Sequence, residues 1–407
     1  MPVNWKKNKK LKPDIILKKI DSIKKVSDGE VVRYSPAFEF SEAMAALHSM
    51  IEFPPGMMGL DHEYLLDKAV SDAIRAGELT VQAVEKALNA LVKNQLAARM
   101  ERFSVLTSIS VQRQFPFKVV HIDKVRIRIL DGNYPQKYAG RRNLVRRMGD
   151  RLDQKSWNYR NVIAYVESKS AEQAVGECFR AMDIQRAIWG LFANSSWEML
   201  DDSWNPINKI RLGQVHTVHK RTGKPATDKM WHDPNFVPNK LFSSNSPNFS
   251  KNCKWVASRL AECRYSDTVK EALLRYVRAL DERDQNTALI HLWSALESLT
   301  VPLHADYDLL TRRCSFLFRE RDYHHQVLEH LREYRNQNIH SGFQSERVRS
   351  NCFQLQYYFI NLIVFHMKNV AEFGTLDEAN QFLDLPHGKR TLENRKRLIE
   401  KAIKFVS

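Results

Sequence analysis

The chain has 407 residues, is 43% hydrophobic and 10% aromatic, and carries a net charge of +16. This length exceeds the size at which a single hydrophobic core stops growing, so we expect two or three domains. The composition excludes a mainly disordered chain, and no apolar run approaches the ~18 residues that a membrane-spanning helix needs. The basic N-terminus lacks an apolar region behind it, which argues against a secretory signal.

Residues 61–101 are predicted to form two helices. Asp61 is a suitable N-cap and Gly77 a suitable stop for the first helix, and the second begins at Thr80. Apolar residues then recur at helical spacing, which predicts a buried stripe. The residues of this stripe are Val84, Leu88, Leu91 and Leu96.

The apolar pattern changes after residue 101 to an alternation that predicts β-strands in "FSVLTSISVQ" and "KVRIRIL". In the second stretch Lys124, Arg126 and Arg128 face away from the aliphatic residues between them. A basic face of this kind suits an RNA groove, but any half-exposed strand has the same pattern, and we favour that simpler interpretation. A strand at "NVIAYVES", a helix at "AEQAVGECFRAMDIQRAIWGLF" and a strand within 210–224 are expected next.

Residues 231–252 are rich in Pro, Asn and Ser and predict a long loop or domain connection. From residue 268 onward the pattern is helical, with helices expected at 268–283, 285–301, 306–320, 323–340, 346–373 and 389–405. The sequence therefore predicts an α+β N-terminal region followed by an all-α, helical-bundle C-terminal domain. The expected divisions are a basic segment at 1–30, an α+β recognition or regulatory domain at 31–250, and the helical domain at 268–407.

The positive charge is concentrated in the first part of the chain. Residues 268–407 hold 20 Lys and Arg against 18 Asp and Glu, so the first 267 residues carry +14. Two clusters supply most of this charge, at 1–25 and at 137–160, and a polyanion such as RNA is the expected partner. A solvated surface is the alternative. The candidate RNA-binding residues are Lys6 to Lys12 and Arg141, Arg142, Arg146, Arg147 and Arg151, with Arg142/Arg146 and Arg147/Arg151 spaced as i,i+4 helical pairs.

No metal or nucleotide cofactor is expected. His216 and His219 are three residues apart in a predicted strand and so face opposite sides, which is wrong for a shared metal even with His232 nearby. The sequence contains no phosphate-binding P-loop, no dinucleotide fingerprint and no G-x-S-x-G turn. The five scattered cysteines form no C-x-x-C pair, which indicates reduced thiols and a cytoplasmic protein. Because no apolar run is long enough to span a bilayer, no membrane partner is expected.

The stretch "LREYRNQNIHSG" at 331–342 carries the strongest chemical signal. Arg335 and His340 are five residues apart, about 140° around an unbroken helix, so they share a phosphate only if the helix ends or bends. Ser341-Gly342 is expected to supply that ending. A guanidinium fork and an imidazole titrating near ~6.5 are a minimal metal-free set for phosphodiester chemistry. Asn336 is placed to bond the phosphate or to orient the imidazole.

This stretch occurs in a helical domain with "ALIHLWSALESLT" before it and the amphipathic "NCFQLQYYFINLIVFHMKNVAEF" after it. The order resembles a HEPN domain, whose signature is Arg-x(4–6)-His, commonly with a polar residue directly after the arginine. The segment around Glu297 is similar to the neighbouring helix in the Apea-like branch of that family. The resemblance covers about residues 268 to 407.

The resemblance implies a metal-independent endoribonuclease that forms a homodimer through the C-terminal domain, with both motifs in one cleft. By analogy His340 is the general acid and base, and Arg335 binds the scissile phosphate. Asn336 supports both of these residues, and Glu297 is a further supporting residue. The products are a 2′,3′-cyclic phosphate and a 5′-OH, so RNA is cut and DNA is spared. Many such proteins are antiviral or stress toxins that cut tRNA or other RNA, which favours an antiphage-defence effector, with an inhibitory or trigger protein as a further partner.

A homodimer is also suggested by the aromatic helix expected at 352–367, whose large side chains exceed what one face can bury. Burial on all sides within the domain is the alternative. Three other functions stay open: a catalytically inactive HEPN-type module for RNA binding or dimerisation, a DNA-binding regulator, and a purely structural motif. In the structural motif, Arg335 pairs with Glu333 or Glu329 and His340 caps the helix.

Overall fold

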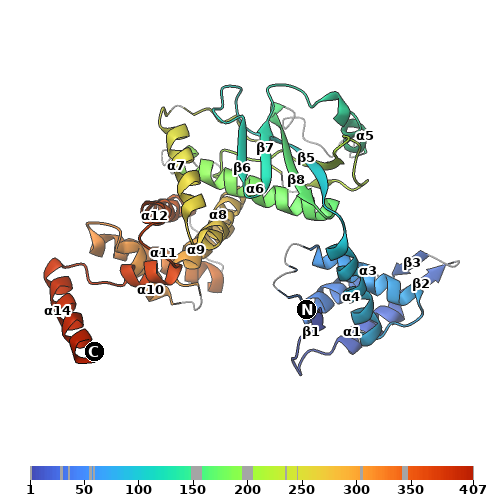
Figure 1. Ribbon diagram of the computed structural model, residues 1–407, viewed down its shortest axis with the longest axis horizontal. Coiled ribbons are helices and arrows are strands. Elements are labelled where there is room, and N and C mark those ends of the chain that lie inside the picture. Colours follow the sequence, from blue (N-terminus) through green and yellow to red (C-terminus); the bar gives the residue numbers. More distant parts are fainter. Residues whose placement is uncertain are drawn as a thin grey trace. The chain divides into compact units, whose positions relative to one another are not determined.

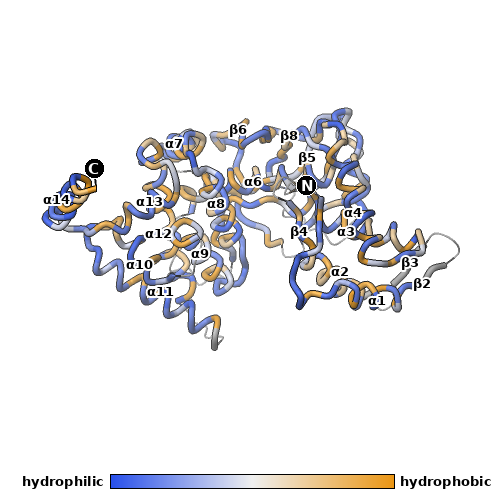
Figure 2. Tube along the Cα trace, turned by 60° about the horizontal axis from the view of Figure 1, so that its bottom comes forward, coloured by the Kyte–Doolittle hydropathy of each residue, from blue (hydrophilic) through white to orange (hydrophobic). Residues whose placement is uncertain are grey.

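The computed structural model combines helices with a small β-sheet, which confirms the mixed α+β and helical layout (Figure 1). Figure 2 shows apolar residues recurring along the helices, as packed amphipathic helices require. The structure describes residues 2–27, 31–34, 37–54, 57, 60–147, 158–194, 205–233, 236–244, 246–302, 306–341 and 347–406. These residues pack into two units, the first made of 1–105, 165–178 and 218–228, and the second of 106–164, 179–217 and 229–407. Packing does not show which part folds alone, so the expected domain boundaries stay a prediction.

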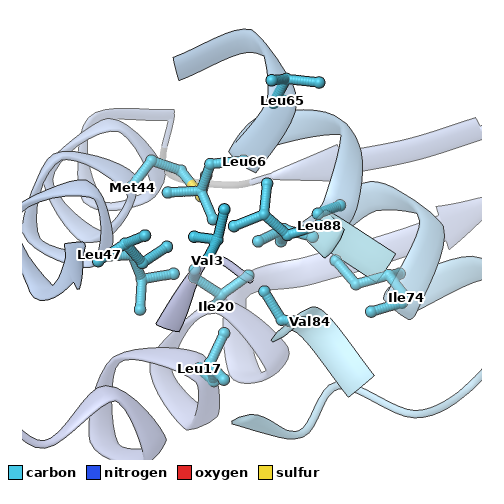
Figure 3. Packing of buried hydrophobic residues seen from close by; sticks show 14 of the residues in the cluster. Val3, Leu17, Ile20, Met44, Leu47, Leu65, Leu66, Ile74, Val84 and Leu88 are labelled. Atoms are coloured by element: carbon cyan, nitrogen blue, oxygen red, sulfur yellow. The ribbon is translucent and has the colours of Figure 1, made fainter. Parts of the chain in front are cut away.

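The first unit is built mainly from helices. They are α1 (Pro13–Ile23), α2 (Ala37–Met50), α3 (His62–Arg75) and α4 (Val81–Ala97). Two small antiparallel pairs accompany them, β1 (Asn4–Trp5) with β4 (Ile51–Glu52) and β2 (Lys24–Ser27) with β3 (Val31–Tyr34). The core draws on every one of these helices, and Figure 3 shows Leu17, Leu47, Leu66 and Leu88 converging in it. Apolar residues of the basic N-terminal segment are thus part of this core.

Helices α3 and α4 begin at the N-cap residues that the sequence predicts. Asp61 accepts a hydrogen bond of 3.0 Å from the backbone N–H of Tyr64, and Thr80 accepts one of 3.1 Å from Ala83. Gly77 follows α3 with φ of 77°, a left-handed conformation that glycine adopts without strain. In α4 the buried stripe contains Val84, Leu88 and Val92, whereas Leu96 is 39% exposed.

A six-stranded sheet has the order β10-β9-β5-β8-β7-β6. Its strands are β5 (Glu101–Ile109), β6 (Val119–Ile122), β7 (Val125–Ile129), β8 (Arg160–Ser168), β9 (Val215–Lys220) and β10 (Trp231–His232). In β7, Val125, Ile127 and Ile129 are buried while Arg126 and Arg128 are exposed, so the half-exposed strand is confirmed. The two short strands β6 and β10 were not predicted.

Most predicted helices of the second unit are present within a few residues. They are α6 (Ala171–Ala193), of which only the residues after Cys178 belong to this unit, α8 (Ser266–Asp281), α9 (Gln285–Thr300), α10 (Tyr307–Ser315), α11 (Arg321–Ser341), α12 (Val348–Lys368) and α14 (Lys389–Val406). Three more helices were not predicted as such: α5 (Arg141–Arg146), α7 (Phe249–Glu262) and α13 (Leu376–Leu383). The loop expected at 231–252 is therefore too long at both ends, because β10 occupies its first two residues and α7 its last four.

A buried ionic network joins α6 to α8 within the second unit. Arg186 on α6 is 4% exposed and donates hydrogen bonds to Asp281 at 3.1 and 2.8 Å and to Asp183 at 2.7 Å. Burial alone would lower the pKa of Arg186, but the two carboxylates raise it above its ordinary value. Because the ions are paired and bonded, the network holds α8, and α9 packed against it, at a defined place beside α6.

Helix α12 is a central helix of this unit. Phe353 and Phe359 are buried, and Phe359 stacks on Tyr276 of α8 with 4.5 Å between ring centroids. Phe365 is half-buried and Tyr357 is 50% exposed. Most of the large side chains at 352–367 are therefore used inside the unit, which is the alternative that the sequence left open. The homodimer stays a prediction, but this helix no longer provides an argument for it.

Candidate active site

Helix α11 is regular past both ends of the Arg335–His340 motif. It continues to Ser341, so the backbone neither ends nor bends between the two residues. Gly342 and the side chain of His340 lie outside what the structure describes. Since the helix is unbroken, positions 335 and 340 are about 140° apart around its axis. The helix therefore ends at the predicted Ser341, which lies after His340 and not between the two motif residues. That both residues bind one phosphate stays a prediction.

Hydrogen bonds to one asparagine hold α11 against α9. Asn286 Oδ1 accepts from the Tyr334 hydroxyl at 3.0 Å and from Asn338 Nδ2 at 2.9 Å. Asn286 is 7% exposed and lies in the first turn of α9, where Asp284 caps its backbone N–H. Both partners on α11 are one helical turn apart, so this contact sets the rotation of α11 at the motif.

Arg335 is held by an aromatic ring and an amide. Its guanidinium carbon lies 4.9 Å from the ring centroid of Tyr307, the first residue of α10, and Nη1 donates a hydrogen bond of 3.1 Å to Asn336 Oδ1. Its Nε is buried and has no hydrogen-bond partner among the described residues. The bond between Asn336 and the arginine was not expected from the sequence, and the role of Asn336 in supporting the phosphate and the imidazole stays a prediction. Neither Tyr307 nor Asn286 was expected at the site, because no local sequence pattern links them to the motif.

The neighbouring Arg332 has a different environment. It forms ion pairs with Asp308 and, at 3.1 Å, with Glu329. Glu333 accepts a hydrogen bond of 3.1 Å from Gln337. Within the described part of the chain, no carboxylate forms an ion pair with Arg335. Glu329 and Glu333 have other partners, which removes the structural alternative proposed for this arginine.

Glu297 on α9 lies in the electrostatic environment of Arg335 without forming an ion pair with it. The carboxylate is half-buried, and its Oε1 has no hydrogen-bond partner among the described residues. Burial raises the pKa of Glu297, and the positive charges of Arg335 and Arg275 offset this only in part. The site therefore contains one buried carboxylate oxygen and one buried arginine nitrogen that have no hydrogen-bond partner among the described residues, on two helices that pack together.

The five candidate RNA-binding arginines have different environments. Arg141 donates hydrogen bonds to Thr217 Oγ1 at 2.9 Å and to the Val215 carbonyl at 3.1 Å, so it is tied to β9. Arg142 and Arg146 are exposed on the short helix α5. The expected helical pair of Arg147 and Arg151 is not seen, because α5 ends at Arg146 and Arg151 lies outside the described residues.

Lysines of the N-terminal cluster lie on the surface of the first unit. Those of the candidate set are all exposed: Lys6, Lys7, Lys9, Lys10 and Lys12. Their exposure is compatible with a phosphate backbone as partner. It is equally compatible with solvent, so the RNA-binding role stays a prediction.

The histidines of β9 are held by hydrogen bonds. His216 Nδ1 lies 2.7 Å from Thr107 Oγ1, and His219 Nδ1 lies 2.9 Å from the Gly223 carbonyl. Burial lowers the pKa of His216 to about 3, with nearby positive charges adding to the effect. Within the described ranges, no group of three or more His, Cys, Asp or Glu residues could hold a metal ion.

No protein-family model matches the chain, and neither a curated protein nor a solved structure matches it. The resemblance to HEPN domains therefore rests on the motif and on the order of the helices around it. In the described part of the chain, every helix is too short or too polar to cross a bilayer.

Proposed function

We propose that this chain is a metal-independent endoribonuclease of the HEPN type. The observation that carries the proposal is the environment of Arg335. Tyr307 and Asn336 position its guanidinium, one of its nitrogens is buried without a partner, and no described carboxylate forms an ion pair with it. Arg332, one turn away, is neutralised by two acids. An arginine that is positioned but not paired is suited to bind the phosphate of a substrate.

The proposed reaction uses the ribose 2′-OH as nucleophile. His340 takes the proton of this hydroxyl, the 2′-oxygen attacks the phosphorus, and the bond to the 5′-oxygen breaks. The imidazolium returns a proton to the leaving 5′-oxygen, which gives a 2′,3′-cyclic phosphate and a 5′-OH. Arg335 stabilises the charge that develops on the phosphate oxygens, and Asn336 keeps the guanidinium in place.

A second copy of the chain completes the proposed site. Positions 335 and 340 are about 140° apart around an unbroken helix, so they lie on different faces of α11. Two α11 helices related by a two-fold axis bring Arg335 of one copy toward His340 of the other. The geometry of α11 supports the homodimer in this way, whereas the aromatic content of α12 does not.

In this proposal the exposed bases of the N-terminal part select the RNA, with tRNA as one candidate. The enzyme acts in the cytoplasm as an effector of antiphage defence or as a toxin, under the control of an inhibitory or trigger protein. The charge of Glu297 alters the electrostatic potential at Arg335.

The test is cleavage of RNA in the presence of EDTA. We expect products ending in a 2′,3′-cyclic phosphate, and no cleavage when the scissile nucleotide lacks its 2′-OH. His340→Ala should lower the rate by roughly 10²- to 10⁴-fold. His330→Ala is the matched control, since His330 is exposed on the same helix outside the motif. Equal activity of the His340→Ala and wild-type proteins would refute the assignment.

One observation favours a second candidate, an inactive module that binds RNA or forms dimers. The stacking of Arg335 on Tyr307 also stabilises the contact between α10 and α11, with no chemistry required. RNA that is bound but never cut, by protein that is otherwise folded, would support this candidate. Tighter binding to duplex DNA than to RNA would instead support the DNA-binding regulator.

A further inference from the structure

Helix α14 differs from the other described helices of the second unit because none of its residues is buried. Its apolar side chains are exposed, with Leu398, Ile399 and Ile403 each near 60% and Phe405 at 90%. Figure 2 shows polar and apolar residues mixed along its coil. An 18-residue helix with this much exposed apolar surface is unstable alone in water, so it needs a partner.

The apolar residues of α14 lie together on one side. At 100° per residue they cover an arc of about 160°. The members of this arc are Leu392, Leu398, Ile399, Ala402, Ile403, Phe405 and Val406. Arg395 is the one base within the arc and lies at its centre, so its long side chain has to extend past the apolar residues to reach a lipid phosphate. Arg390, Arg397 and Lys401 lie outside the arc, on the polar face of the helix.

Helix α14 also carries a large excess of basic over acidic residues. The helix holds seven Lys and Arg against two Glu, a net of +5. The preceding residues 268–388 hold 13 bases against 16 acids, a net of −3. The near-neutral value for the whole C-terminal region is therefore the average of a slightly acidic helical part and one strongly basic helix.

We propose that α14 binds the surface of an anionic lipid bilayer and lies in the plane of the interface. A polar face rich in Lys and Arg, a broad apolar face and low overall hydropathy are the features that such interfacial helices share. The apolar arc enters the boundary between headgroups and acyl chains, and the opposite bases contact lipid phosphates. The expectation of no membrane partner rested on the lack of a spanning segment, and an interfacial helix needs none.

Charge complementarity favours this partner over two others. Pairing α14 with α14 of a second copy would bring two helices of +5 together, and their charges would repel. RNA would satisfy the bases but would leave the apolar arc in water, because its surface is formed largely by phosphates and sugars. An anionic bilayer satisfies both faces of the helix at once.

The test is flotation of the full-length protein with vesicles. One set contains phosphatidylcholine alone, and the other contains about one third phosphatidylserine. We expect the protein to float with the anionic vesicles only, and less of it to float as salt is raised. The variant Ile399→Gln/Ile403→Gln/Phe405→Gln keeps the charge and removes the apolar arc, and it should bind at least roughly tenfold more weakly.

A second variant, Arg390→Gln/Arg397→Gln/Lys401→Gln, keeps the apolar arc and removes three charges. It should bind anionic vesicles at least roughly tenfold more weakly and lose most of the salt dependence. Lys86→Gln/Lys93→Gln on α4 removes two exposed charges elsewhere and should leave flotation unchanged. RNA cleavage should be unaffected by all three, so a failure of this proposal is distinguishable from a failure of the proposed nuclease.

Four results would overturn the proposal. The first is a wild-type protein that does not float with anionic vesicles. The second is dissociation of a dimer in the apolar-arc variant, which would make α14 an interface between copies. The third is a lower unfolding temperature of that variant without vesicles, which would mean that α14 packs on its own chain. The fourth is loss of RNA binding with unchanged flotation in the charge variant.

Discussion

The guanidinium of Arg335 on α11 lies over the ring of Tyr307 on α10, with 4.9 Å between its central carbon and the ring centroid. The two residues are far apart in the sequence and meet because α10 and α11 pack together. The ring restricts the directions available to the arginine without neutralising its charge. Tyr307 is therefore a positioning residue for the group proposed to bind the scissile phosphate.

Replacing this ring should weaken the proposed enzyme without abolishing it. A cation–π contact is worth roughly 0.5 to 2 kcal/mol, so Tyr307→Leu should lower kcat/KM by about 2- to 30-fold. Tyr307→Phe keeps the ring and should stay close to wild type. Equal losses in the two variants would show that the hydroxyl, and not the ring, matters. Steady-state cleavage of a fluorescent RNA measures kcat/KM of the two variants.

Arg335 and Arg332 offer a matched pair on one helix. Arg335→Ala should lower the cleavage rate by roughly 10²- to 10³-fold, because the developing phosphate charge loses its counter-ion. Arg332 is paired with Asp308 and Glu329, so Arg332→Ala should change stability by about 1 kcal/mol or less and leave most of the rate. Cleavage rates and unfolding temperatures of both variants test whether the two arginines differ in this way. Similar rates for the two would refute a special role for Arg335.

Mixing two inactive variants tests whether the site takes residues from two chains. If Arg335 of one copy works with His340 of the other, each mixed dimer of Arg335→Ala and His340→Ala chains regains one intact site. An equimolar mixture should then recover about a quarter of wild-type activity, given random pairing in a two-fold dimer. A mixture that exchanges subunits yet stays inactive would place both residues in one chain's site.

The stability of the protein should depend on pH through Glu297. Burial raises the folded-state pKa of this carboxyl, so the folded protein holds its proton to a higher pH than the unfolded chain does. The ionised carboxylate consequently destabilises the fold above the folded-state pKa, and this cost disappears as pH falls toward the unfolded value near ~4.3. Glu297→Gln should be more stable than wild type at neutral pH and equal to it near pH ~4.

Chemical unfolding at several pH values measures this difference. Glu372→Gln is the control, because Glu372 is exposed after α12 and its replacement should change the free energy of unfolding by less than about 0.5 kcal/mol. A Glu297→Gln protein that is less stable than wild type at neutral pH would contradict the prediction. It would show that attraction to Arg335 outweighs the cost of burial.

The exposed arginines of α5 should contribute to RNA affinity. Arg142→Gln/Arg146→Gln should weaken RNA binding and lower the log–log salt slope by about 0.7 to 0.9 for each lost phosphate contact. Arg141→Gln should mainly lower the unfolding temperature, because Arg141 bonds Thr217 and Val215. Binding titrations at three salt concentrations separate these effects. An unchanged slope in the double variant would leave the cluster as solvated surface.

Where one local pattern dominates, the sequence predicted the structure well. Alternation in β7 and the caps Asp61 and Thr80 are examples, because burial of one strand face and capping of backbone N–H groups depend on neighbouring residues only. The start of α7 was missed because the Pro-, Asn- and Ser-rich stretch before it extends to the first helical residues. Leu17 and Ile20 of α1 were overlooked among nine lysines, although they enter the core.

By itself, the sequence determined the spacing of Arg335, Asn336 and His340, the helical order around them and the uneven distribution of charge. Spacing and charge follow from the order of the residues alone, so they can be predicted without knowing the fold. Only the tertiary structure decided that Arg335 lies on Tyr307, that Asn286 sets the rotation of α11, and that Asp308 of α10 pairs with Arg332. These pairings depend on which helices pack together, and packing is the sum of many weak contacts between residues distant in the sequence.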